Sequence, residues 1–142
     1  MKVQIWSDVM CPFCYIGKKN FEAALEKMSF KEEIEVEWKS YQLDPSLNET
    51  SGSKTVNQYL AEHKRMPIAQ IEQMQQRIKE MGQQAGIDFQ MDKAVVSNTF
   101  LAHKLIHFAA KSNKAAEAEE LLFKNHFTDG KNVADIQTLV NI

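Results

Sequence analysis

Two cysteines stand close together near the N-terminus, and they are the only cysteines among the 142 residues. They form the segment Cys11-Pro12-Phe13-Cys14. A bridge between positions this close encloses almost no chain, so it cannot staple a domain of this length. A lone C-x-x-C pair in a reducing compartment indicates redox chemistry or metal binding instead.

The flanking residues predict a strand before the cysteine pair and a helix after it. Residues 2–7 alternate polar and apolar side chains and favour a strand. Residues 12–28 carry apolar side chains at helical spacing, and Pro12 suits a first helical turn because its missing N–H has no partner there. Residues 34–40 alternate strictly, as a strand with one wet face does. This order predicts a βαβ unit with parallel strands and a right-handed crossover.

The remainder of the chain predicts a loop followed by helices. Residues 43–54 have the Asp, Pro, Asn, Ser and Gly content of a loop. The expected helices start at Ser53 or Thr55, run from Pro67 to Gly82, start again at Ser97 or Asn98, cover 114–127 with Leu121 and Leu122 inward, and restart near Val133. Gly82 is expected to end the long helix. The composition therefore divides the chain into residues 1–54 and 55–142.

The position of the cysteine pair at a helix start supplies a chemical mechanism. Unpaired N–H groups and a partial positive charge at that point favour a thiolate at Cys11, with a pKa below the ordinary value of about 8.5. We therefore expect Cys11 to attack a substrate disulfide and Cys14 to resolve the mixed disulfide. Phe13 offers the thiolate neither a cation nor a hydrogen bond, so a strongly oxidising site is not predicted.

Composition narrows the expected partners and location. With 17 basic and 19 acidic side chains, the net charge of −2 gives no support for binding nucleic acid or an anionic membrane. No apolar run approaches the roughly 20 residues that span a bilayer. Residues 1–8 lack the apolar stretch of a signal peptide. We expect a cytoplasmic protein without nucleic-acid or membrane partners.

The segment SDVMCPFCYIGK at residues 7–18 closely resembles the active-site segment of DsbA-family thioredoxin-fold oxidoreductases, in the FrnE-like branch. The segment QLDP at residues 42–45 resembles the loop after the second strand of that branch. Residues 98–105 resemble its NT-x-x-AH-x-L segment. The likeness covers essentially the whole chain, and the cysteine segment is its most specific part.

This resemblance implies an α/β fold with a thioredoxin-like βαβ start and a long α-helical insertion. It implies dithiol–disulfide exchange at Cys11 and Cys14 with a protein or small-molecule disulfide or thiol. No metal or organic cofactor is implied beyond an external low-molecular-weight thiol couple. The residues expected to tune the site or to contact substrate are Pro12, Phe13, Tyr15, Asn98 and Thr99.

The chain departs from the family pattern at its C-terminal end. Such proteins return to the sheet after the insertion with two further strands, a final helix and a cis-proline loop that faces the C-x-x-C. Here the sequence stops at Ile142, and Pro12, Pro45 and Pro67 do not match that loop. We expect an incomplete sheet, in which the strand at 2–7 exposes an edge that a second copy of the chain or rearranged helices would cover.

Three alternatives stay open. A glutathione-binding transferase or isomerase of the kappa and hydroxychromene-carboxylate type shares the fold but usually places Ser where Cys11 stands. A truncated, self-associating chain without turnover is the second. The third is a zinc site that joins Cys11 and Cys14 to His103 and His107, four residues apart on one helix. The long gap weakens this last signal, and partly exposed helix residues are the simpler expectation for both histidines.

The other conspicuous side chains receive structural interpretations. Lys18 and Lys19 are expected to be solvated helix residues, and Trp6 and Trp38 are expected to pack in or near the sheet. His126 is isolated in the sequence, and no chemistry is assigned to it.

Overall fold

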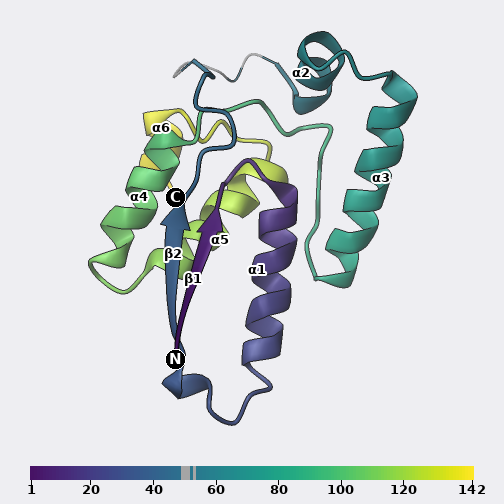
Figure 1. The fold of residues 1–142 in the computed structure, drawn as a ribbon. Helices are drawn as coiled ribbons and strands as arrows, with labels where there is room; N and C mark the ends of the chain where they lie inside the picture. Colours follow the sequence, from purple (N-terminus) through teal and green to yellow (C-terminus); the bar gives the residue numbers. More distant parts are fainter. Residues whose placement is uncertain (49–51, 53) are drawn as a thin grey trace.

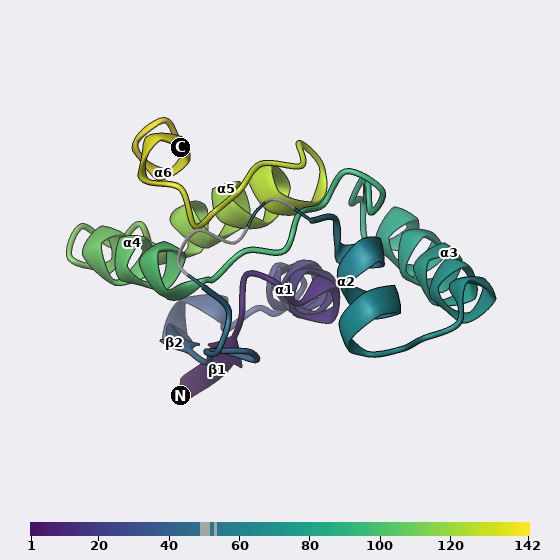
Figure 2. The ribbon, with the colours of Figure 1, turned by 90° about the horizontal axis from the view of Figure 1, so that it is seen from above.

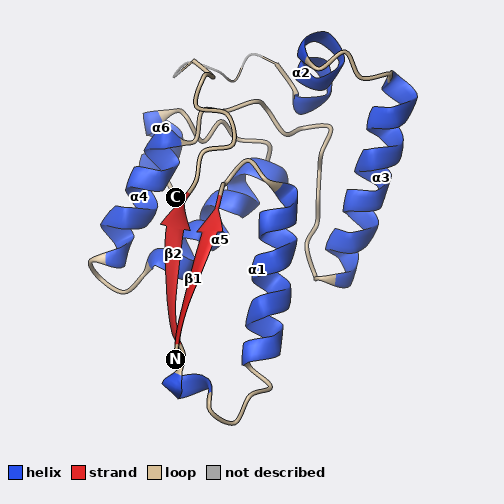
Figure 3. Cartoon of the chain, in the orientation of Figure 1, coloured by secondary structure: helices blue, strands red, loops and turns tan. Residues whose placement is uncertain are grey.

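The computed structural model describes residues 1–48, 52 and 54–142. Its strands and helices follow in the predicted order (Figures 1 and 3). The elements are β1 (Lys2–Ser7), α1 (Pro12–Leu25), a short 3₁₀ turn (Lys31–Glu33), β2 (Glu35–Ser40), α2 (Val56–His63), α3 (Ile68–Gln84), α4 (Phe100–Ala110), α5 (Ala115–Phe127) and α6 (Ile136–Val140). The α/β expectation, a βαβ start followed by a long helical part, is confirmed.

The two strands pair in parallel across the α1 connection, as the alternating segments predict. Val3 lies opposite Val36, and Ile5 lies opposite Trp38. These residues share the more buried face, whereas the alternate positions along β1 are exposed. Seen from above, the helices lie to one side of the strands (Figure 2). Within the part of the chain that is described, the sheet has these two strands alone.

An aromatic cluster joins the βαβ start to the helical part. Tyr15 on α1 stacks on Phe123 of α5, with ring centroids 4.8 Å apart. Phe89 meets Tyr15 edge-on at 6.0 Å and Phe127 at 5.4 Å. All four rings are buried, and such pairs add about 0.5–1.5 kcal/mol each beyond their buried area. The core therefore lies directly behind the first turn of α1.

One helix start agrees with the sequence, and a second lies one residue later than expected. Thr55 forms a capping box with Gln58, whose N–H lies 3.2 Å from the Thr55 hydroxyl. Ser53, the alternative cap, lies outside the described residues. The N-cap of α4 is Thr99 rather than Ser97 or Asn98, although the N–H of Phe100 donates to Asn98 Oδ1 at 2.9 Å. A local side-chain hydrogen bond is thus present at the start of both helices.

Gly82 does not end α3, which corrects the prediction. The helix continues to Gln84, and Gly86 follows with a positive φ of 75°. A Cβ on Gly82 would lie 2.2 Å from Phe89 Cδ2. The glycine instead lets the Phe89 ring lie against the helix. A glycine is needed at position 82 because Phe89, in the loop that follows α3, packs against it.

Burial differs from expectation at two positions, and one helix ends earlier than expected. Trp38 is buried as predicted, but Trp6 is 59 % exposed on the open face of the sheet. Leu121 is 41 % exposed, although Leu122 beside it is fully buried. The predicted helix 12–28 ends at Leu25. Among the described helices, none is both long and apolar enough to cross a membrane.

Candidate active site

The cysteine pair lies at the start of α1, as predicted. Cys11 is the N-cap residue in extended conformation, and Pro12 is the first helical residue. The N–H of Cys11 donates to the Asp8 carbonyl at 3.0 Å, and the N–H of Cys14 donates to the Cys11 carbonyl at 3.1 Å. Both cysteines are free thiols and half-buried. The turn places them one above the other at the exposed end of the helix.

The two thiols hydrogen-bond to each other, so the pair shares protons. This bond lowers the pKa of Cys14 to about 6, against burial, with help from the Asp8 N–H and the Ser7 hydroxyl. The same bond, with burial, raises the pKa of Cys11, although the N–H groups of Phe13 and Cys14 act against the rise. This corrects the expectation of a lowered pKa at Cys11: in the resting pair the lowered pKa belongs to Cys14. Such a pair titrates as a unit. It loses its first proton below the ordinary thiol pKa and holds its second strongly.

A buried carboxyl lies beneath Cys14. Glu119 of α5 is 1 % exposed, and its Oε2 has no hydrogen-bond partner among the described residues. Burial raises the pKa of Glu119 to about 7, while the Ser7 hydroxyl and the Lys18 charge oppose the rise. The charge of Cys14 raises it further. A carboxyl that titrates near neutrality beside a half-buried thiol can take up or return that thiol's proton.

The sequence interpretation missed Glu119, although a signal existed. Glu119 shares a helical face with Leu122, Phe123 and His126, all of them buried. Glu119 precedes these residues by three, four and seven positions, so it lies on the apolar face of the helix. An acidic residue at such a position is expected to be buried. Helical spacing could not show that Glu119 lies beside Cys14, because the two residues are 105 positions apart in the sequence.

Lys18 corrects the expectation of a solvated lysine. Its side chain is 3 % exposed, and its ammonium lies 2.5 Å from Glu22 and 2.9 Å from Glu120. Lys19 is partly exposed and reaches Glu120 at 3.1 Å. The Tyr15 hydroxyl also donates to Glu120, at 2.7 Å. These contacts tie the active-site helix to α5.

His103 is buried rather than partly exposed, because it bonds to a buried acid. Its Nε2 lies 3.2 Å from Asp8 Oδ1. His107, one turn later, instead bonds to the Ser40 hydroxyl at 2.8 Å. The two histidines of the zinc alternative thus take separate partners, and the described residues include no cluster of three potential metal ligands. Buried His126 has its pKa lowered to about 4 by desolvation.

The other predicted site residues divide into exposed and buried groups. Phe13 is 51 % exposed beside the thiols, where substrate can reach it. Tyr15 is buried and bonded to Glu120, so it faces the core. Asn98 and Thr99 are buried too. Thr99 reaches the active-site turn through a hydrogen bond to Asp8.

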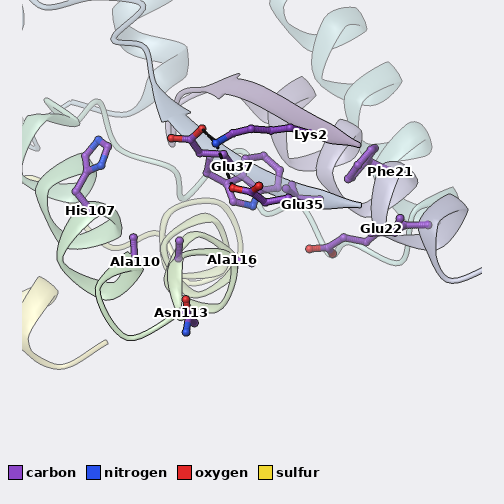
Figure 4. A pocket seen from close by; sticks show the side chains of 13 residues that line it. Lys2, Phe21, Glu22, Glu35, Glu37, His107, Ala110, Asn113 and Ala116 are labelled. Carbon is purple, nitrogen blue, oxygen red and sulfur yellow. Dashed lines mark ion pairs between the residues drawn. The ribbon is translucent and has the colours of Figure 1, made fainter. Parts of the chain in front are cut away.

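Of the hollows formed by the described residues, two bear on the site. A groove of about 920 Å³ runs along α3 and includes Phe13, Met74 and Arg77 in its lining, but neither cysteine lines it. A second, of about 570 Å³, lies near the other end of the strands. There Lys2 lies between Glu35 and Glu37, with an ion pair to each (Figure 4). Neither cysteine lines this second hollow.

Comparison with known proteins agrees with this geometry. Residues 2–142 match the family model described as a DSBA-like thioredoxin domain. The uncharacterised YwbO protein of Bacillus subtilis is 28 % identical over 148 residues, covering 99 % of this chain and 63 % of that protein.

Two solved structures resemble the chain. A probable DsbA oxidoreductase from Streptomyces coelicolor superposes with a TM-score of 0.92 at 27 % identity, over 99 % of this chain and 60 % of that one. The cytosolic disulfide reductase DsbM of Pseudomonas aeruginosa superposes with a TM-score of 0.63 at 15 % identity, over 99 % and 62 %. The chain thus spans about three fifths of the length of these relatives. At the level of the family, the likeness supports thiol–disulfide oxidoreductase chemistry. The chain belongs to the DSBA-like thioredoxin domain family.

Proposed function

We propose that this chain exchanges a dithiol for a disulfide at Cys11 and Cys14, with a protein or small-molecule disulfide as substrate. The observation that carries the proposal is the hydrogen-bonded pair of free thiols at the start of α1, with a first pKa held below the ordinary thiol value. A thiolate at working pH is the species that attacks a disulfide.

The proposed reaction has two displacements. As Cys11 attacks one sulfur of the substrate, its proton passes along the shared hydrogen bond to the Cys14 thiolate; a mixed disulfide forms, and the first substrate thiolate leaves. Cys14 then gives its proton to Glu119 and attacks the Cys11 sulfur. The Cys11–Cys14 disulfide forms, and the second substrate thiolate leaves. Two electrons pass from the protein to the substrate, and an external low-molecular-weight thiol couple returns them by the reverse steps.

The remaining features of the proposal follow from this chemistry. The electrons move between sulfur atoms, so no resident metal or organic cofactor takes part. We place the reaction in the cytoplasm, where reduced thiols are maintained and a chain whose only cysteines form this pair has no structural disulfide to keep. A homodimer that covers the open edge of β1 is part of the same proposal.

Trapping of the mixed disulfide tests the proposal. Cys14→Ser and Cys11→Ser are each treated with oxidised glutathione and examined by intact mass spectrometry. Cys14→Ser is expected to accumulate one glutathione adduct at Cys11, while Cys11→Ser accumulates far less and the wild type ends as the internal disulfide. An adduct on Cys14 alone would reverse the assigned roles. The absence of any adduct or internal disulfide would refute exchange at this site.

A further inference from the structure

The side chain of Asp8, three positions before Cys11, is held by three residues from two other segments of the chain. Its carboxylate is 1 % exposed. Oδ2 accepts the N–H of Leu43 at 2.6 Å, from the loop after β2. Oδ1 lies 3.2 Å from Nε2 of His103 on α4. The Thr99 hydroxyl bonds to the same carboxylate. Donors from outside the active-site turn therefore fix the position of this side chain.

The backbone of Asp8 belongs to the active-site turn itself. Its carbonyl accepts the N–H of Cys11 at 3.0 Å. Its N–H acts on the Cys14 thiol and lowers the pKa of that group. One residue therefore connects both cysteines to the loop after β2 and to α4. The position of the thiols depends on that connection.

The carboxylate of Asp8 is ionised. Burial alone raises the pKa of this group, but the bonds from His103, Leu43 and Thr99 together hold the pKa below its ordinary value. A carboxylate only accepts hydrogen bonds, so His103 carries its proton on Nε2. The negative charge opposes a thiolate at Cys14 and raises its pKa.

Other titratable groups surround this charge. His103 on α4 bonds to it, and buried His126 on α5 lies within its electrostatic reach. Glu119 on α5 and Lys18 on α1 lie on the Cys14 side. Glu119 is the other acid that acts on Cys14. Unlike Asp8, it titrates near neutrality, so Asp8 supplies the permanent negative charge beside the thiols.

We propose that Asp8, held by His103, is a positioning residue that fixes the Cys11–Cys14 turn and, as a permanent buried negative charge, biases the pair toward donating electrons. The reduced pair carries a thiolate and the disulfide does not. A nearby anion therefore raises the free energy of the reduced form and favours the disulfide. The proposal rests on the proposed exchange and adds its preferred direction, which is the reduction of substrate disulfides.

The first test is the pH profile of thiol alkylation by iodoacetamide in the full chain, which needs no turnover. Asp8→Asn keeps the side-chain shape and removes the charge. Its apparent first thiol pKa is expected to fall by about one unit, which means about tenfold more thiolate well below that pKa. A purely structural role predicts the opposite sign, because a disordered turn returns the thiols toward their ordinary pKa.

Variants of His103 test the clamp separately. His103→Leu removes the donor and leaves the charge less compensated, so the first thiol pKa is expected to rise. His103→Gln keeps an N–H donor and should stay close to the wild type. In the Asp8→Asn background, His103→Leu should have no further effect, because its influence passes through the carboxylate. These His103 variants also decide the question if Asp8→Asn does not fold.

An equilibrium with glutathione tests the direction of electron flow. The balanced reaction joins the protein dithiol and oxidised glutathione to the protein disulfide and two reduced glutathione molecules. For Asp8→Asn the constant of this reaction should fall about tenfold, or about 30 mV. An unchanged or raised thiol pKa in folded Asp8→Asn, or an unchanged His103→Leu, overturns the proposal. A lowered pKa without any exchange would instead remove the proposed function and leave the electrostatic role intact.

Discussion

The buried ammonium of Lys18 lies 2.9 Å from the carboxylate of Glu120 and joins the active-site helix α1 to α5 across 102 positions of sequence. Burial disfavours the charge on Lys18, yet its bonds to Glu22 and Glu120 raise its pKa overall. The ion pair therefore keeps its charge in a place where burial alone would lower the pKa of a lone lysine. It is one of the contacts that hold the cysteine-bearing helix against the helical part.

Removing this ammonium should destabilise the protein. Lys18→Met is expected to lower the free energy of unfolding by about 2–3 kcal/mol, because Glu22 and Glu120 lose a partner in a partly dry setting. Lys19→Met is the matched control. Lys19 also reaches Glu120 but is about one-third exposed, so its loss should cost below about 1 kcal/mol. Urea unfolding of both variants measures the difference, and equal losses would contradict the assigned burial.

Glu119 should make the protein less stable as pH rises. Its pKa is about 7 in the folded chain against 4.5 as the ordinary value. The folded state therefore binds more protons than the unfolded state between these values, and stability falls as pH rises through that window. The full difference is on the order of 3 kcal/mol. Glu119→Gln has no buried carboxylate to ionise. The stability of this variant relative to the wild type should therefore be higher at pH 8 than at pH 4.5.

The neighbouring Glu120 provides a control of opposite sign. Burial raises the pKa of Glu120, but Lys18 and Tyr15 outweigh burial and lower it. Glu120→Gln should therefore lose stability at neutral pH, where the carboxylate is the favoured form. Thermal melts of both variants across pH give the comparison. If Glu119→Gln lost as much stability at pH 8 as Glu120→Gln, Glu119 would not be the buried acid described.

His126 should weaken the fold in acid. Desolvation lowers its folded pKa to about 4 from 6.5. Below pH 6.5 the unfolded state binds the extra proton first, so stability falls as pH drops toward 4. His126→Asn should flatten this loss, which is on the order of 3 kcal/mol. Exposed His63 serves as the control through His63→Asn, and an equal change in the two variants would argue against a buried His126.

Glu119 and His126 change the free energy of unfolding with pH in opposite directions over much of the same pH range. Glu119 loses stability as pH rises from 4.5 to about 7, whereas His126 gains it from about 4 to 6.5. The wild-type profile should therefore be flatter than that of either single variant. The double variant should again be nearly flat.

Two helical glycines should respond to alanine with opposite signs. In Gly82→Ala the new Cβ would lie 2.2 Å from Phe89 Cδ2, so a loss of about 1–3 kcal/mol is expected from overpacking. In Gly17→Ala no atom of the described residues outside the local helix backbone lies within 4 Å of the new Cβ, and the better helix propensity of alanine should add about 0.5–1 kcal/mol. Chemical denaturation measures both. A Gly82→Ala variant as stable as wild type would mean that Phe89 does not pack there.

The sequence by itself determined the features that depend on near neighbours. Alternation and helical spacing predicted both strands, α1, α3 and α5, because side-chain periodicity is a local property. Thr55 was recognisable as a cap, since its partner Gln58 is three residues away. The cysteine pair at a helix start was also local, and so was the resemblance built around it.

Only the tertiary structure decided which charged groups surround the thiols. Lys18, expected in solvent, is buried because Glu120 of α5 meets it there. His103 is buried against Asp8, 95 positions earlier in the sequence. The pKa of Glu119 is raised to about 7 because helix packing buries its carboxyl away from water. Burial and long-range pairing set these protonation states, and no spacing along the chain encodes which distant residue will supply the partner.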